Sequence, residues 1–419
     1  MSSLEFLNNF QLADFDYMLP KELIAVYPLL KRDESNLLVY DKSKTIRHAK
    51  FKELPTLIPE GSLLLRNASK VISARLFLQK QSGGRVEALL LEPIYPSSDP
   101  ETTLRATQKC IWKALLRGRN LKEGTVLQLI RPQTKDANLT ARVIEKNSQS
   151  YTVEFIWFSD DITFCDILNQ VGHIPLPPYI SRSDENIDRE RYQTIYGNKL
   201  GSVASHTAGL HFTSEVLNKL KEQSISFAEV TLHISLGTFK PIQATNIYNH
   251  TMHKENFSVT YCDLTKIYNF LKNRSTENLL VAIGTTSVRT LESIFWYAQF
   301  LYHQKPSTKS EPIEIPQYIW KHHPKKLSIV ETLEFLLDRM EQLNINSLAG
   351  GTNLFITPDY KINFFDALVT NFHQPKSTLL LLVYAFVGED WKKIYQSALE
   401  NRYRFLSYGD SSLLFKTNL

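Results

Sequence analysis

A change of pattern in the middle of the chain constrains its fold most. Residues 71–164 contain short β-rich runs at intervals of roughly ten residues, separated by Gly, Pro, Asn and Asp, which is typical of a small antiparallel barrel or sandwich. Before and after this region, helical and strand patterns alternate as in an α/β sheet. The sequence therefore predicts an α/β domain, with a mixed sheet and flanking helices, formed by residues 1–70 and 165–419. We expect a smaller antiparallel β-barrel domain at 71–164 to be inserted in it.

The composition is that of an ordinary soluble globular protein. Of its 419 residues, 43% are hydrophobic and 22% charged, and the net charge of +5 permits an acidic partner without requiring one. The first residues lack the pattern of a secretory signal, and the most apolar run, residues 379–386, is far shorter than the roughly 20 residues that span a bilayer. The three widely spaced cysteines fit a reducing cytosol. We therefore expect a cytoplasmic protein without a membrane segment.

The stretch 199–213 (KLGSVASHTAGLHFT) combines small residues with two histidines. Small residues let a ligand approach the backbone closely, so this stretch is typical of a binding loop. Thr213 is expected to cap a following helix, whose positive end would face the loop and favour an anionic or polar ligand group. A tight turn that serves only backbone packing explains the same pattern. The candidates here are Ser205, His206, Thr207, Gly209, His211 and Phe212.

Polar residues also follow several predicted strands. The carboxyl ends of strands in an open α/β sheet are where ligands bind. A buried strand ends at Asn67 and is followed by a predicted polar turn at 67–70, and Asp366 lies in a run that ends before a buried helix. The other residues of this kind are Gly237, Thr238, Phe239, Gly284, Thr285, Thr286, Arg289, Thr370, Asn371 and His373.

Three charged motifs have plainer explanations. Arg32 and Asp33 are adjacent, which usually indicates a surface ion pair. The basic residues at 117–122 fit a solvated face better than a phosphate site, and residues 303–326 fit a linker or flexible excursion. His322 and His323 lie in that excursion and lack the spacing of a chelating pair.

The chain contains neither a glycine-rich phosphate loop nor the motifs of zinc proteases and radical enzymes. A Ser/His/Asp hydrolase is also disfavoured, because Ser205 lies in no nucleophile-elbow motif. The remaining His, Asp, Thr and Asn residues at strand ends suit acid–base chemistry without a metal.

Together, seven segments resemble the S-adenosylmethionine:tRNA ribosyltransferase-isomerase family of queuosine biosynthesis. They are GHIPLPPYI, RYQTIYG, GSVASHTAGLHFT, VTLHISLGTF, AIGTTSVRTLES, DALVTNFHQPKSTLLLLV and YRFLSYGD, in the order and spacing of that family. The resemblance covers the chain except for the region around residues 300–350.

This resemblance implies an enzyme that uses S-adenosylmethionine as a substrate. The enzyme would transfer and isomerise the ribosyl group onto 7-aminomethyl-7-deazaguanine at the wobble position of tRNA, giving epoxyqueuosine-tRNA with release of adenine and methionine. It also implies an α/β domain interrupted by a β-barrel. No permanently bound cofactor or metal is expected, and we expect a monomer.

Roles follow for several residues. Histidine suits proton transfer near neutral pH, so His211 is our candidate base, with His233 or His373 assisting. Asp366, with Thr370 and Asn371, would hold the ribose hydroxyls, and Thr285, Thr286 and Arg289 the methionine carboxylate. Phe212, Phe239 and Tyr408 would stack on a base, and Asp410 would orient the amine. The remaining substrate-binding candidates implied are Asn67, Arg75, Ser205, His206, Thr207, Gly209, Gly237, Thr238 and Gly284.

Three positions depart from the family's pattern. Residues 67–70 read Asn-Ala-Ser-Lys where the family has an arginine in place of Lys70, His206 replaces a proline, and Ser235-Leu236 replaces a Gly-containing pair. Lysine does not reproduce the bidentate fork of arginine. These departures leave open an alternative function, that of a catalytically divergent or inactive tRNA-binding relative.

Overall fold

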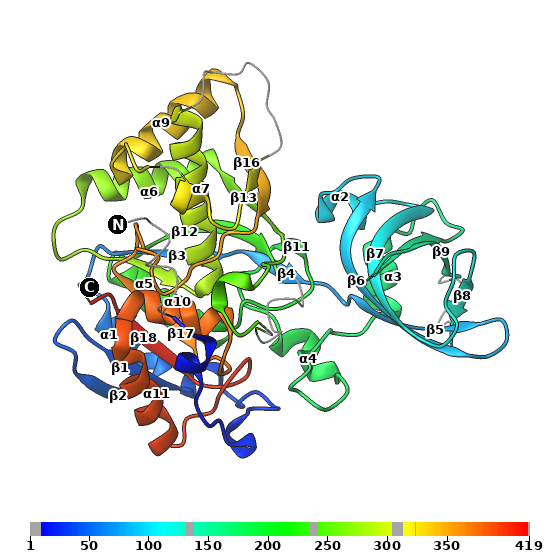
Figure 1. Ribbon diagram of the computed structural model, residues 1–419, viewed down its shortest axis with the longest axis horizontal. Helices are drawn as coiled ribbons and strands as arrows, with labels where there is room; N and C mark the ends of the chain where they lie inside the picture. Colours follow the sequence, from blue (N-terminus) through cyan, green and yellow to red (C-terminus); the bar gives the residue numbers. More distant parts are fainter. Residues whose placement is uncertain are drawn as a thin grey trace.

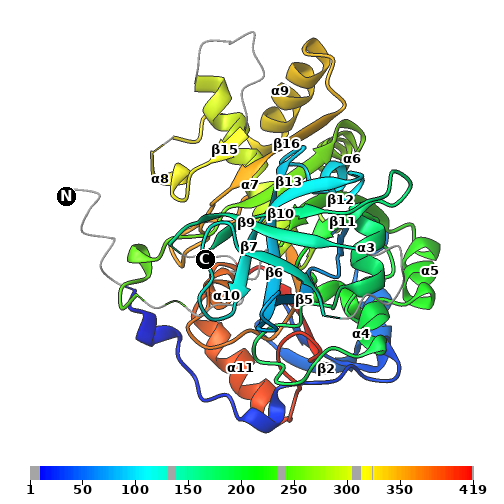
Figure 2. The ribbon, with the colours of Figure 1, turned by 90° about the vertical axis from the view of Figure 1, so that its right-hand side faces the viewer.

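The computed structural model describes residues 10–130, 138–148, 150–234, 242, 244–303, 313–322 and 324–417. Figure 1 shows a larger α/β unit with a smaller barrel to one side of it, and in Figure 2 the barrel lies in front of the larger unit. The predicted fold class, a mixed sheet with flanking helices interrupted by an antiparallel barrel, is confirmed.

The larger unit is built on a ten-stranded mixed sheet. In spatial order its strands are β15 (Ile313–Ile315), β16 (Ser347–Thr352), β13 (Glu255–Thr260), β12 (Ser226–His233), β3 (Leu63–Asn67), β14 (Leu280–Ile283), β17 (Ala367–Asn371), β18 (Ser411–Phe415), β1 (Asn36–Tyr40) and β2 (Ile46–Lys50).

Helices cover both faces of this sheet. Successive residues of a strand point to opposite faces, and in β3 Leu63 and Leu65 join one apolar cluster while Leu64 joins another. The first cluster includes residues of α6 (Tyr261–Asn273), α7 (Thr285–His303), α8 (Ile319–His322), α9 (Ile329–Gln342), α10 (Thr378–Val387) and α11 (Trp391–Glu400). The second includes residues of α1 (Leu54–Leu57) and α5 (Ser214–Glu222). Residues 63–65 of β3 and all of β14 are therefore apolar without alternation, as in a sheet buried on both sides.

The barrel is closed by six antiparallel strands. Around the barrel these are β10 (Tyr151–Ile156), β7 (Lys109–Arg117), β6 (Arg85–Tyr95), β5 (Arg75–Lys80), β8 (Val126–Leu129) and β9 (Thr140–Lys146). Its own apolar cluster contains Trp112 and Phe155. The same cluster includes Phe164 and Leu168 of α3 (Phe164–Val171), so this helix packs onto the barrel. The domain division at 70/71 and 164/165 stays a prediction. A short helix α2 (Pro100–Leu104) follows β6.

Two local predictions are wrong. The expected polar turn at residues 67–70 contains β4 (Ser69–Val71), which pairs with β11 (Lys199–Ser202) in a two-stranded parallel sheet. Within the expected linker at 303–326, β15 pairs with β16 at the edge of the large sheet and is followed by α8. Pairing with a strand far along the chain is not visible in local composition. His323 lies outside the described residues.

The predicted helix cap at Thr213 is confirmed. The Thr213 side chain accepts a hydrogen bond from the backbone N–H of Val216 and so caps α5. Ser377 caps α10 in the same way through Leu380, and α10 is the buried helix expected from its apolar sequence. No helix of the described residues is both long and apolar enough to cross a membrane.

Candidate functional site

The order of the strands brings several polar segments to one edge of the sheet. Strands β12, β3, β14 and β17 are parallel to one another, so their carboxyl ends share an edge. Because β18 is antiparallel to β17, and β1 is parallel to β18, the amino ends of β18 and β1 lie at the same edge. Ser35 precedes β1, Asp410 precedes β18, Asn371 ends β17 and Thr285 follows β14. Segments far apart in the sequence therefore meet where open α/β sheets bind ligands.

His211 lies at this edge with both ring nitrogens hydrogen-bonded. It ends η6 (Thr207–His211), a short 3-10 helix. Nδ1 lies 2.8 Å from Ser35 Oγ, and Nε2 lies 3.0 Å from Asn371 Oδ1. The Asn371 amide nitrogen donates to the carbonyls of Leu406 and Ser407, which turns its oxygen toward the histidine. Nε2 therefore donates its proton to Asn371, and Nδ1 accepts a hydrogen bond from the Ser35 hydroxyl.

This geometry leaves His211 neutral at pH 7. Burial lowers its pKa from 6.5 to about 4, while the hydrogen bond to Asn371 and the Asp410 carboxylate act in the opposite direction. A neutral imidazole whose free lone pair faces a hydroxyl is a base acting through that hydroxyl, as in serine nucleophile pairs. The charge that it gains would be stabilised by Asn371 and Asp410. The hydrogen-bonded series Ser35–His211–Asn371 can therefore take part in proton transfer.

Three adjoining cavities lie along the same edge. The α7 cavity, of about 620 Å³, is lined by the first turns of α7 and by apolar side chains that include Leu354, Phe355 and Leu379. The β17 cavity, of about 370 Å³, shares Leu379 with it and is lined by Asn371. The β1 cavity, of about 280 Å³, shares Ser407 with the β17 cavity and is lined by Ser35 and His211. His211 therefore lines one cavity and is hydrogen-bonded to a residue that lines the next.

Some of the predicted site residues line these cavities. The β17 cavity is lined by Thr207, Asn371 and His373, and the α7 cavity by Thr285, Thr286 and Arg289. Thr370 is buried beside them and its Oγ1 lies 3.0 Å from His373 Nε2. Gly284 precedes α7 with φ +86°, a conformation that favours glycine.

Arg289 does not offer a free guanidinium to a ligand. It is buried and ion-paired with Glu255, and it donates to the backbone carbonyls of Leu354, His253 and Thr352. The Oγ1 of Thr286, in contrast, is buried without a hydrogen-bond partner among the described residues. The α7 cavity therefore offers the helix N-terminus and Thr286, rather than Arg289, to a bound group.

Asp366 lies at the opposite edge of the sheet. It precedes β17, so the five residues of that strand separate it from the edge that carries Asn371. Its carboxylate accepts hydrogen bonds from Arg274 and from the backbone N–H of Leu280 at the start of β14. The structure does not bring Asp366 together with Thr370 and Asn371, because these residues lie at opposite ends of β17. The alternating pattern of a strand shows which face of the sheet a residue points to, but not which end of the strand lies near a ligand.

Several other candidates serve packing. Asn67 is fully buried and bonds the backbone of Leu232 and Ser69. A Cβ on Gly209 would lie 2.2 Å from the Tyr196 hydroxyl, so its small size serves close packing. Phe212 is buried against Phe51 and does not line the three cavities.

Asp410 and Tyr408 have protein partners at the edge. The Asp410 carboxylate accepts hydrogen bonds from the backbone and side chain of Asn36 and from the backbone of Arg404. Tyr408 lines the β1 cavity and its hydroxyl donates to Asp188. Asp410 is therefore placed to act on the charge of His211 rather than to contact a ligand amine.

Three further candidates, of which Ser205 and His206 are buried and His233 is partly buried, lie outside the cavities. Ser205, His206 and His233 line none of the three, and each has a polar atom without a hydrogen-bond partner among the described residues. Gly237, Thr238 and Phe239 lie outside the described residues.

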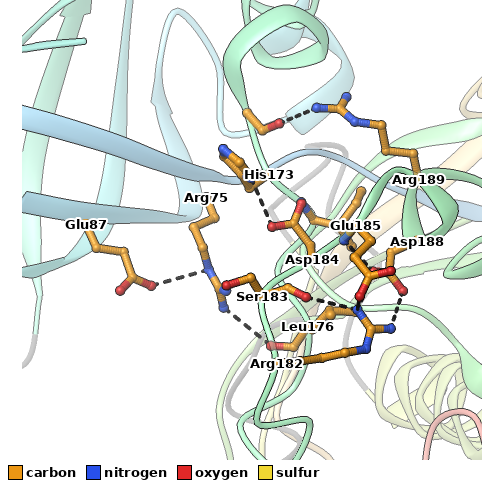
Figure 3. Close-up of polar contacts among 12 residues, drawn as sticks. Arg75, Glu87, His173, Leu176, Arg182, Ser183, Asp184, Glu185, Asp188 and Arg189 are labelled. Carbon is orange, nitrogen blue, oxygen red and sulfur yellow. Dashed lines mark hydrogen bonds and ion pairs between the residues drawn. The ribbon is translucent and has the colours of Figure 1, made fainter. Parts of the chain in front are cut away.

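Arg75 lies at the junction of the barrel with the larger unit (Figure 3). Its Nε is 3.3 Å from Glu87 in the barrel, and its Nη2 donates to the carbonyl of Leu176 in the returning chain. Nearby, His173 Nδ1 lies 2.9 Å from Asp184. Arg75 therefore connects the two parts of the molecule and lines none of the three cavities.

Comparison with known proteins gives the family. A family model described as "Queuosine biosynthesis protein" matches residues 12–414. The chain belongs to this family. It is 37% identical over 412 residues to the S-adenosylmethionine:tRNA ribosyltransferase-isomerase of Thermosipho africanus (strain TCF52B), covering 97% of this chain and 100% of that one. It is 36% identical over 405 residues to the enzyme of the same name from Legionella pneumophila (strain Paris), covering 96% and 98%.

A solved structure is also similar. The crystal structure of S-adenosylmethionine tRNA ribosyltransferase from Thermotoga maritima is 30% identical and covers 96% of this chain and 99% of that chain, with a TM-score of 0.45.

The sequence of this queuosine-family chain predicts His211 and Tyr408 as site residues, but not the other polar residues of the β1 cavity. Arg32 was interpreted as half of a surface pair with Asp33, which is wrong: Arg32 donates to the carbonyls of Gln193, Leu210 and Glu190. Asp33 accepts instead from Thr213. Ser35, Arg191 and Arg404 were not singled out. The available signal was weak, namely a polar cluster directly before a buried strand.

The described residues contain no group of three or more His, Cys, Asp or Glu side chains placed to hold a metal ion. The polar side chains that line the three cavities are histidines, amides, hydroxyls and guanidiniums, together with Glu255, which is paired with Arg289.

A buried ion pair supports the segment beside the β1 cavity. Asp188 of α4 (Asn186–Arg191) is fully buried, and its carboxylate accepts two hydrogen bonds from Arg182 (Figure 3). It accepts a third from the hydroxyl of Tyr408. We expect Asp188→Ala to lower the free energy of unfolding by about 3 kcal/mol, because Arg182 would lose its close carboxylate partner and the buried Tyr408 hydroxyl its acceptor. Urea denaturation measures this loss. The control is Glu190→Gln, at an exposed position of the same helix, and an equal effect in both variants would contradict the prediction.

Proposed function

We propose that this chain is an S-adenosylmethionine:tRNA ribosyltransferase-isomerase. It would transfer and isomerise the ribosyl group of S-adenosylmethionine onto 7-aminomethyl-7-deazaguanine at the tRNA wobble position, giving epoxyqueuosine-tRNA, adenine and methionine. The support is the match to the queuosine biosynthesis family over residues 12–414 and the relatives of this name that cover nearly the whole chain.

The observation that carries the mechanism is the position of His211. The reaction requires a proton to leave the carbon beside the sulfonium, adenine to depart with the help of a proton, and the substrate amine to be neutral. His211 is neutral, faces the Ser35 hydroxyl and is bonded to Asn371 of the neighbouring cavity. We assign the proton transfer to His211 acting through Ser35, with Asn371 and Asp410 stabilising the imidazolium.

We place S-adenosylmethionine in the α7 cavity, with its ribosyl carbons toward the β17 cavity. The α7 cavity is the larger and is lined mainly by apolar side chains. The methionine carboxylate would lie at the N-terminus of α7, where backbone N–H groups and the helix dipole favour an anion. Thr286, with its unpartnered buried hydroxyl, would donate to it. The ribose hydroxyls would face Asn371 and Thr207, which line the β17 cavity.

The decisive experiment is product formation. Purified protein is incubated with S-adenosylmethionine and precursor-bearing tRNA, and adenine and methionine are measured. We expect both products, in amounts that depend on the tRNA. Binding of tRNA without release of adenine would contradict the proposal and favour the catalytically divergent relative. The cytoplasmic location and the absence of a permanent cofactor stay predictions. So does the monomeric state, which the mass of the purified protein in solution tests.

Asp366 provides a test of where the donor binds. We expect Asp366→Asn to leave the Kd for S-adenosylmethionine unchanged within about twofold, because the residue lies at the other edge of the sheet and shares no partner with the cavities. Isothermal titration calorimetry measures this constant. A tenfold weaker binding would restore the ribose-binding role predicted from the sequence.

A further inference from the structure

The β1 cavity concentrates positive charge. Arg32, Arg191 and Arg404 all line it, and the described residues that line it include no Asp or Glu. The three arginines come from different segments: η4 (Arg32–Glu34), the last residue of α4, and the turn that precedes β18. A cavity of about 280 Å³ therefore faces three guanidinium groups.

Backbone carbonyls hold the three guanidiniums in place, and the Asp410 carboxylate lies near that of Arg404. Arg32 donates three hydrogen bonds to backbone carbonyls, and Arg191 donates two, to the carbonyls of Leu29 and Leu30. Arg404 donates to the carbonyl of Tyr27, and its Nε lies 3.7 Å from an Asp410 oxygen that also accepts from Asn36. Carbonyls fix the direction of a guanidinium without neutralising its charge, and each guanidinium has five N–H groups.

Three further observations indicate that an anion belongs here. The Nε of Arg191 is buried without a hydrogen-bond partner among the described residues. Burial lowers the pKa of Arg32, and the nearby Arg191 lowers it further. Burial also lowers the pKa of Arg404. Partly buried like charges repel strongly, so a bound anion would relieve both the repulsion and the missing hydrogen bond.

We propose that the β1 cavity binds a phosphodiester group of the RNA substrate, beside the nucleotide that reacts. Arginine forks match the oxygens of a phosphate in geometry and charge. Phosphate contacts fix the position of a nucleic acid on a protein, and here they would do so next to Ser35 and His211 in the same cavity. This inference rests on the proposed function, because it assumes that the substrate is the tRNA named there.

The mouth of the cavity favours RNA over the carboxylate of S-adenosylmethionine. The carbonyls held by Arg191 and Arg404 belong to the loop 27–30, whose Leu30 is 93% exposed and whose Tyr27 is 48% exposed. Exposed apolar and aromatic side chains beside arginines are typical of surfaces that bind unpaired nucleotides. The methionine carboxylate of S-adenosylmethionine is proposed to lie at the N-terminus of α7, so it does not need the arginines of the β1 cavity.

The test compares RNA binding with donor binding in Arg404→Gln. The probe is an anticodon stem-loop RNA that carries the precursor base. We expect Arg404→Gln to raise its Kd about tenfold and to reduce the slope of log K against log salt by about 0.7, the value for one lost contact to a single-stranded phosphate. The Kd for S-adenosylmethionine should stay unchanged.

The matched control is Arg402→Gln. Arg402 is exposed, lies two residues away in the same turn and does not line the cavity, so its substitution should change neither the RNA affinity nor the salt slope. If Arg404→Gln does not fold, Arg191→Gln takes its place.

A stem-loop with neutral methylphosphonate linkages around the wobble nucleotide tests the same contact from the side of the RNA. We expect this RNA to bind wild-type protein more weakly and to lose no further affinity in Arg404→Gln.

Unchanged RNA affinity and salt slope in both Arg404→Gln and Arg191→Gln would overturn the proposal. Weaker binding of S-adenosylmethionine with unchanged RNA binding would also overturn it, since the cavity would then hold the donor carboxylate. Failure of the proposed function is a separate result: wild-type protein would release no adenine, whether or not the arginines bind RNA.

Discussion

Replacing His211 by glutamine is expected to lower kcat for adenine release about 10³-fold, the usual contribution of a general base. Glutamine is polar and keeps a group that can donate to Asn371, but it has no lone pair basic enough to accept a proton from Ser35. Because His211 acts on the chemical step, we expect the Kd for S-adenosylmethionine to change much less than kcat. Single-turnover measurement of adenine, alongside calorimetric titration of the donor, separates the two effects.

His206→Gln is the matched control for this substitution. His206 is buried like His211 and lies five residues earlier in the chain, but it lines none of the three cavities. We expect it to retain turnover within about threefold, provided that thermal unfolding shows both variants to be folded. Near-normal turnover of His211→Gln, or equal losses in both variants, would show that His211 is not the base.

Mild acid is expected to destabilise the native protein strongly. Burial lowers the pKa of His206 and His373 to about 3 and that of His211 and His233 to about 4, from 6.5 in the unfolded chain. Below pH 6.5 the unfolded state therefore binds protons that the native state does not, so the free energy of unfolding falls as the pH falls. Each histidine should remove about 1 kcal/mol between pH 6.5 and 5.5, and the four together about 4 kcal/mol.

Urea denaturation at pH 7.5, 6.5 and 5.5 measures this loss. Asp and Glu titrate mainly below this range, so the histidines dominate the slope. The same series on His206→Gln should show a smaller slope of the free energy of unfolding against pH, because one proton fewer is taken up on unfolding. This holds even if the variant is less stable at pH 7.5. A free energy of unfolding that does not change between pH 7.5 and 5.5 would refute the prediction, because the buried histidines would then be protonated without cost.

The site could be predicted only in part. The stretch 199–213, which contains His211, and the strand end at Asn371 are recognisable in the sequence, since small residues and polar groups after buried strands are local signals. Arg32 and Ser35 were missed because four charged or polar residues in a row look like an ordinary surface turn. Asp366 was expected beside Thr370 and Asn371, but it precedes the amino end of β17 and they lie at its carboxyl end. The sequence of the strand alone does not show which of its two ends lies near a ligand.

The sequence by itself determined the fold class and the family, because periodic apolar patterns and ordered motifs are properties of neighbouring residues. It also determined that α5 would be capped by Thr213. Only the tertiary structure decided which polar residues share a cavity. That depends on the order and direction of the strands, which place Ser35, His211 and Asn371 within hydrogen-bonding distance although 336 positions separate the first from the last. Strand pairing is set by packing over the whole chain, so no local pattern reveals it.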